Sequence, residues 1–213
     1  MQNLALTVGP THLSDGGQGA QGLRAGREAE LIMSELHGKY YEKNSRGGMF
    51  GSAWNAVTVA ATHVSPLAAG TGTPIWALYN PIGSNVNCAI LKVLQDLTSG
   101  TPGGPLLWNL IPVPQNISAA NTLPVSLLLN SPVSSVAKIW TNTALTGSSA
   151  GTLLWPEGGF AAVAAGAGIQ SLMNLHDGDI IVPPGSMIAL CAYATGTTHL
   201  TSGMVVHEEV AVL

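Results

Sequence analysis

The sequence predicts an all-β protein, a jelly-roll-like β-sandwich that follows a polar N-terminal arm. Three observations lead to this prediction. The chain has 213 residues and is 46% hydrophobic, which is enough for a core. After residue 50, short runs rich in β-branched and aromatic residues alternate with turns rich in Gly, Pro, Asn and Ser. The same region has no convincing amphipathic helix of about 12 residues, which argues against an alternating α/β fold.

Residues 1–46 form the predicted arm. They carry ten of the 18 charged residues, and the other 167 positions carry only eight. The arm includes a stretch, DGGQGAQG, whose composition favours flexibility. Residues 23–46 place apolar side chains at helical spacing, but Gly38 and a Tyr pair weaken a long helix. We expect a partly extended arm with two short helical turns over 1–46, and a sandwich body over 47–213.

The body is predicted from its strand-like runs and the turns between them. Turn compositions such as NPIGSN, SGTPGGP and VPPGS separate the runs. The Ala-rich segment 160–175 contains Gly166 and Gly168, each costing about 1 kcal/mol relative to Ala in a helix, so a loop with one helical turn is expected there. Strands are expected over 53–64, 75–79, 87–97, 125–130, 136–143, 151–155, 186–195 and 204–213.

Charge is scarce in this sequence. Charged residues make up 8% of the chain, against about 25% in ordinary soluble domains, so a monomer would expose about one charge per 500 Å². Such a surface predicts an oligomer. Seven basic residues and a net charge of −4 argue against nucleic-acid binding. No uninterrupted apolar stretch reaches the roughly 20 residues of a membrane span, and the N-terminus lacks the pattern of a signal peptide.

Several short motifs suggest chemistry but lack the context that the chemistry needs. The pattern G-x-G-x-x-G at 17–22 is not followed by a βαβ unit, so nucleotide binding is not expected. Residues 178–185, GDIIVPPG, resemble the second motif of cupins, but Ile188 stands where a cupin has a metal-binding His. His176, Asp177 and Asp179 have no partner motif. We therefore predict no metal and no cofactor.

No catalytic arrangement is predicted either. His207-Glu208-Glu209 lacks the second His of a zinc-hydrolase motif, because Ala211 occupies that position. On a strand, His207 and Glu209 share one face and Glu208 the other, which suggests a polar strand edge or a subunit contact. There is no G-x-S-x-G motif, and the sequence assembles no triad. The prediction is a protein that is not an enzyme.

The cysteines and tryptophans are predicted to be structural. Cys88 and Cys191 have neither metal-ligand spacing nor a disulfide framework, so both are expected to be buried free thiols. Five tryptophans could form a sugar-stacking platform, but most lie in or beside predicted strands, where core packing is the default. They are Trp54, Trp76, Trp108, Trp140 and Trp155.

Three blocks together suggest a family. They are ELHGKYYEKNSRGGMF in the arm, IWALYNPIGSNVNCAILKV in the body, and DGDIIVPPGSMIALCAYATGTTHLTSGMVVHEEV near the C-terminus. Their order resembles that of small structural proteins of tailed bacteriophages, and they cover about a third of the chain. The resemblance implies a capsid decoration (cement) protein with a jelly-roll-like body that forms a homotrimer. It would lie on the capsid surface of the virion, which is assembled in the host cytoplasm. Its partners would be itself and the major capsid protein or another virion protein.

In this interpretation the arm contacts the partner, because it concentrates charge and aromatic rings beside an almost uncharged body. Three other functions stay open: a tail-associated or host-attachment protein that binds a glycan, a major capsid protein, and an enzyme. The residues expected to contact the partner are Arg24, Arg27, Lys39, Tyr40, Tyr41, Lys43 and Arg46.

Overall fold

The structure of the chain is a computed structural model. It describes residues 39–59, 71–100, 106–111, 120–143, 145–146, 152–158, 170–192 and 199–212. By its internal contacts the chain divides into two units, Met1–Tyr41 and Glu42–Leu213. The second unit begins a few residues before Gly47, where the body is predicted to begin, and it contains all the described strands.

The described residues form one short helix and twelve strands, and every strand pair is antiparallel. The all-β prediction is therefore confirmed. The elements are α1 (Tyr41–Ser45), β1 (Met49–Val59), β2 (Thr71–Gly72), β3 (Trp76–Tyr79), β4 (Val86–Gly100), β5 (Leu106–Ile111), β6 (Val125–Ser126), β7 (Lys138–Thr141), β8 (Leu145–Thr146), β9 (Thr152–Gly158), β10 (Gln170–Val182), β11 (Met187–Ala192) and β12 (His199–Ala211).

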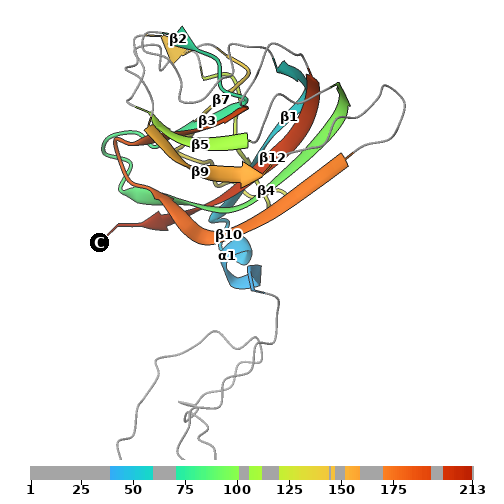
Figure 1. The fold of residues 1–213 in the computed structure, drawn as a ribbon. Helices are drawn as coiled ribbons and strands as arrows, with labels where there is room; N and C mark the ends of the chain where they lie inside the picture. Colours follow the sequence, from blue (N-terminus) through green and yellow to red (C-terminus); the bar gives the residue numbers. More distant parts are fainter. Residues whose placement is uncertain are drawn as a thin grey trace, which may run out of the picture. The chain divides into compact units, whose positions relative to one another are not determined.

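Two five-stranded sheets face each other (Figure 1). The first sheet has the order β10-β4-β12-β1-β6 and the second has the order β7-β3-β11-β5-β9, while β2 and β8 form a separate pair. The chain moves from one sheet to the other at each step from β3 to β7, and again between β9 and β10, β10 and β11, and β11 and β12. This alternation, with β12 inserted between β1 and β4, is the strand order of a jelly roll.

The main core lies between the two sheets. Trp76 and Trp108 of the second sheet pack edge to face, with ring centroids 6.0 Å apart, against Ile90 and Val205 of the first sheet. The indole of Trp76 donates a hydrogen bond of 2.8 Å to the Ser52 hydroxyl, which connects the sheets. Large apolar surfaces and a satisfied indole N–H thus stabilise the sandwich.

The second sheet is buried on both faces. Ala77, Tyr79, Trp140 and Met187 belong to a second apolar cluster that is separate from the main core. Because side chains alternate between the faces of a strand, a sheet covered on both sides needs continuous apolar runs. The runs IWALY and MIALCA, over 75–79 and 187–192, have this property. They explain part of the high apolar content.

Several strand boundaries differ from those predicted. The strands predicted over 75–79, 87–97 and 186–195 correspond to β3, β4 and β11, whereas β1 already begins at Met49. The strand predicted over 125–130 ends at Ser126, since the chain turns there and Asn130 has a φ of 60°. β5 was not predicted as a strand.

The prediction of a loop with one helical turn over 160–175 is wrong for 170–175, which belongs to β10. Residues 160–169 lie outside the described residues. The strand signal is weak because both faces of β10 are partly apolar: Met173 and Leu175 are exposed, while Leu172, on the other face, is half-buried. The usual alternation of polar and apolar residues is therefore missing.

The turn predicted between β10 and β11 is present, and it carries the chain from the first sheet to the second. Gly185 has a φ of 82°, a conformation that favours glycine, and Ser186 N–H donates to the Pro183 carbonyl at 3.1 Å. Asn80 fixes this turn, because its carbonyl accepts from Gly185 N–H at 2.8 Å and its N–H donates to the Ser186 carbonyl at 3.0 Å. Ile188, which stands where a cupin has a metal-binding His, lies in β11 and is buried in the main core.

The only helix among the described residues is α1. It corresponds to one of the two helical turns predicted for the arm, and residues 1–38 lie outside the described residues. None of the described helices has the length and hydropathy to cross a membrane.

Candidate functional site

The residues predicted to contact a partner are only partly described. Arg24 and Arg27 lie outside the described residues. Within the first unit, the Lys39 ammonium lies 5.5 Å from the centroid of the Tyr40 ring, a cation–π distance. Tyr41 is 52% exposed. Their contact with a partner stays a prediction.

Lys43 has a partner within the body. Its Nζ lies 2.8 Å from Glu208 Oε1, which joins α1 to β12. The backbone continues this connection, because Glu209 N–H donates to the Gly48 carbonyl at 2.9 Å. Arg46, at the end of α1, is exposed. The segment that leads into β1 is thus held against the C-terminal half of β12.

The tryptophans are core residues where their side chains are described. Trp54 is 4% exposed, and Trp76, Trp108 and Trp140 are 0% exposed. The side chain of Trp155 lies outside the description. The prediction of core packing is confirmed for these four, and they offer no exposed surface on which a sugar ring could stack.

One buried polar cluster lies at the edge of the main core. The Glu157 carboxylate, on β9, accepts a hydrogen bond from Trp108 Nε1 and lies 2.8 Å from His176 Nε2. The His176 ring packs edge to face against Trp108, with centroids 5.9 Å apart. Glu157 is 5% exposed and His176 is 8% exposed. Because each polar group has a partner, this cluster has the character of a structural network between β5, β9 and β10.

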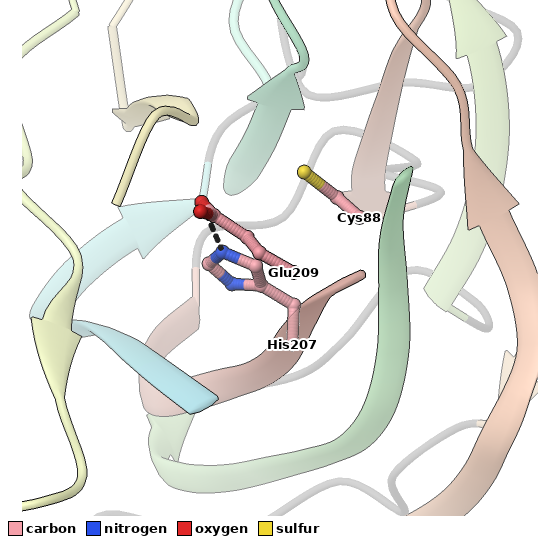
Figure 2. A group of neighbouring side chains, drawn as sticks. All are labelled: Cys88, His207 and Glu209. Atoms are coloured by element: carbon pink, nitrogen blue, oxygen red, sulfur yellow. Dashed lines mark ion pairs between the residues drawn. The ribbon is translucent and has the colours of Figure 1, made fainter. Parts of the chain in front are cut away.

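A second buried cluster joins β4 and β12 (Figure 2). It consists of Cys88, His207 and Glu209, whose candidate ligand atoms all lie within 4.8 Å of one another. Figure 2 shows the Glu209 carboxylate beside the His207 ring, with the Cys88 sulfur pointing toward the same space. His207 Nε2 lies 3.7 Å from Glu209 Oε1, which is longer than a hydrogen bond.

Strand pairing explains why these three side chains meet. Cys88 pairs with Glu209 across the β4–β12 ladder, so the two side chains lie on the same face of the sheet. His207 precedes Glu209 by two residues and therefore shares that face. Phe50 of β1 pairs with His207 and stacks on its ring at 5.7 Å. Cys88 and His207 are both 0% exposed.

The surroundings of the cluster shift two pKa values. Burial alone would raise the pKa of Glu209, but His207 and the hydrogen bonds from Ser135 and the Ala137 amide outweigh it and hold that pKa below its ordinary value. Burial and the nearby Glu209 charge raise the pKa of the Cys88 thiol to about 12. At neutral pH the site therefore holds a carboxylate and a protonated thiol.

The prediction for 207–209 is partly wrong. His207 and Glu209 do share one face, and Glu208 points to the other, where it binds Lys43. However, β12 is a central strand between β1 and β4, so it provides no sheet edge, and His207 is buried within the chain. Cys88 and Cys191 are both buried and free, as predicted.

Large apolar side chains are exposed at both edges of the first sheet. At the β10 edge, Met173, Leu175 and Ile181 are 61%, 59% and 58% exposed. At and beside β6, Leu123 and Leu129 are 85% and 87% exposed. The charge-poor composition thus has a counterpart in the described surface, where apolar side chains occupy positions that usually carry charge.

Comparisons with known proteins identify no family. No family model matches the chain, and no curated protein matches it. Among solved structures, the VP2 subviral particle of infectious bursal disease virus is 13% identical over 76% of this chain and 39% of the viral chain, with a TM-score of 0.12. The chain thus corresponds to well under half of that protein's length, and a TM-score this low does not indicate a common fold.

Proposed function

We propose that this chain is a structural virion protein, a capsid decoration protein that binds the head of a tailed phage as an oligomer and stabilises it. The observation that carries the proposal is the exposure of large apolar side chains at both edges of one sheet, in a body with very few charges. An exposed, apolar edge strand favours association with another chain. Subunit interfaces would remove this surface from water.

The arrangement favours contacts between copies of the chain. The β10 edge and the β6 edge lie at opposite ends of the same sheet. When one edge of a copy packs against the other edge of the next, the contact is heterologous, and such contacts form a closed ring where the rotation between copies closes. A trimer is the ring expected from the family resemblance. Capsid binding would then stabilise the particle by mass action, because the oligomer binds assembled subunits and not separated ones.

The first experiment measures the oligomeric state by light scattering. The wild-type protein is expected at about three times the chain mass of 21.8 kDa. The double variant Met173→Glu, Leu175→Glu places two charges on the β10 edge and should shift the mass toward the monomer. Ile82→Glu is the matched control, since Ile82 is 82% exposed in the turn between β3 and β4. A wild-type protein that stays monomeric at micromolar concentration would refute the oligomer.

The second experiment tests the virion and the arm. A reconstruction of the native particle should place the chain on the outside of the head. Truncation of residues 1–40 keeps α1 and the Lys43–Glu208 pair, so the oligomer should persist while binding to particles falls. Substituting Arg24, Arg27 and Arg46 by Ala should weaken binding less than truncation does. A truncated protein that decorates particles at full occupancy would exclude the arm as the docking element.

A further inference from the structure

The cluster of Cys88, His207 and Glu209 contains an unusual buried group. Neither ring nitrogen of His207 has a hydrogen-bond partner among the described residues, although the side chain is 0% exposed. Buried polar atoms are nearly always paired, because an unpaired one loses its hydrogen bonds to water without replacement. Two potential metal ligands lie beside this imidazole, a thiol and a carboxylate. The arrangement leaves a position that a bound cation would satisfy.

The distances within the cluster are compatible with a bound metal ion. His207 Nε2 and Glu209 Oε1 are 3.7 Å apart, too far for a hydrogen bond. Two ligand atoms that each lie about 2.0 Å from a tetrahedral zinc ion are separated by about 3.3 Å. All three candidate ligand atoms lie within 4.8 Å of one another, so small side-chain rotations bring them to coordination distances.

We propose that Cys88 Sγ, His207 Nε2 and the Glu209 carboxylate bind one Zn²⁺ ion inside the jelly roll. Glu209 binds through Oε2, because its Oε1 accepts the hydrogen bonds from Ser135, Val136 and Ala137. Zinc takes thiolate, imidazole and carboxylate ligands, whereas Mg²⁺ and Ca²⁺ select oxygen alone. Three protein ligands leave the fourth position for a water molecule. The proposal differs from the prediction of no metal. That prediction used local motifs, and these do not show that Cys88 lies opposite Glu209 of a strand far away in the sequence.

Zinc binding exchanges a proton for the metal. The Cys88 thiol loses its proton to solvent as the sulfur–zinc bond forms, while His207 binds through its neutral ring and Glu209 as a carboxylate. Because zinc binds the thiolate and displaces its proton, zinc affinity should rise as the pH is raised.

The ion would fasten three parts of the body. Cys88 lies near the start of β4 and His207 near the end of β12. Glu209 also accepts hydrogen bonds from the Ser135 hydroxyl at 2.5 Å and the Val136 amide at 3.0 Å, which attach the segment before β7. The site is therefore structural in character, and metal binding should stabilise the folded chain.

The test uses the full chain, freed of metal by dialysis against a chelator and then titrated with ZnCl2. Elemental analysis should find about one zinc per chain, and Tm should rise by about 5–10 °C at a hundredfold excess over Kd. Co²⁺ should give a thiolate-to-cobalt charge-transfer band. Cys88→Ser should abolish this band and the Tm rise. Cys191→Ser is the matched control, because Cys191 is equally buried but lies outside the cluster.

Each outcome decides the proposal. Equal zinc binding by the wild type and Cys88→Ser would place the metal elsewhere, and no zinc-dependent rise of Tm in the wild type would overturn the site. Where Cys88→Ser does not fold, the cobalt spectrum of Cys191→Ser decides, because Cys88 is then the only thiol in the chain. A Cys191→Ser protein that binds Co²⁺ without a thiolate band would refute coordination by Cys88.

Discussion

Replacing Glu157 with Ala should destabilise the protein strongly. The carboxylate is 5% exposed and is the hydrogen-bond partner of both Trp108 Nε1 and His176 Nε2. Its removal leaves two buried polar groups without that acceptor, at about 1–3 kcal/mol each. The two costs sum to about 2–6 kcal/mol. For a chain of this size, that loss corresponds to a fall in Tm of about 4–24 °C.

Urea denaturation, followed by tryptophan fluorescence, gives the free energy of unfolding for each variant. Glu157→Gln retains a carbonyl acceptor for Trp108 and should lose less than Glu157→Ala. Glu208→Ala is the surface control, because the Lys43–Glu208 pair has an exposed lysine and such pairs contribute about 0–1 kcal/mol. If Glu157→Ala lost less than about 1 kcal/mol, as the surface control should, the network would not stabilise the fold and the reasoning would be wrong.

Three further predictions concern packing and the thiols. Gly203→Ala should lower the free energy of unfolding by about 1–3 kcal/mol or more. The added Cβ would lie 2.4 Å from the Trp54 ring and 2.5 Å from the Leu94 carbonyl oxygen, and an unchanged Tm in thermal unfolding would contradict this contact. Cys191 should resist iodoacetamide in the native protein at pH 8, because burial raises its pKa to about 12, and labelling as fast as in urea would count against that burial. The same raised pKa stabilises the fold below the unfolded value of 9.0, so stability should fall as the pH rises from 9 toward 12, and less so in Cys191→Ala.

Much of the fold could be predicted because its signals are local. The runs that became β3 and β11 are apolar over their whole length, and β4 contains the apolar run CAIL. The turn at Pro183–Ser186 has the residues that its backbone geometry requires. β10 was missed in part because its exposed side chains are as apolar as its inward-facing ones. A function that exposes apolar surface thus removes the alternation from which strands are recognised.

The candidate metal site could be predicted only in part. The two-residue period of a strand placed His207 and Glu209 on one face, and the structure agrees. That Cys88 joins them depends on the pairing of β4 with β12, and on the register that sets Cys88 opposite Glu209. Register is fixed by packing of the whole sandwich, so no local pattern contains it.

The position of β1 determines how the body would respond to force. β1 lies inside the first sheet, and its first residue, Met49, pairs with Glu208 near the C-terminal end of β12. Tension on the chain before Met49, resisted by a subunit bound along β10, would load the β1–β12 hydrogen bonds in shear, so that many must break together. Tension between the chain before Met49 and the C-terminus would instead open the β1–β12 ladder one residue pair at a time, because both ends then pull at the same end of the ladder. In the proposed function, a protein anchored by the arm and by its sheet edge would resist an expanding shell along its mechanically stronger direction, where the unfolding rate sets the limit.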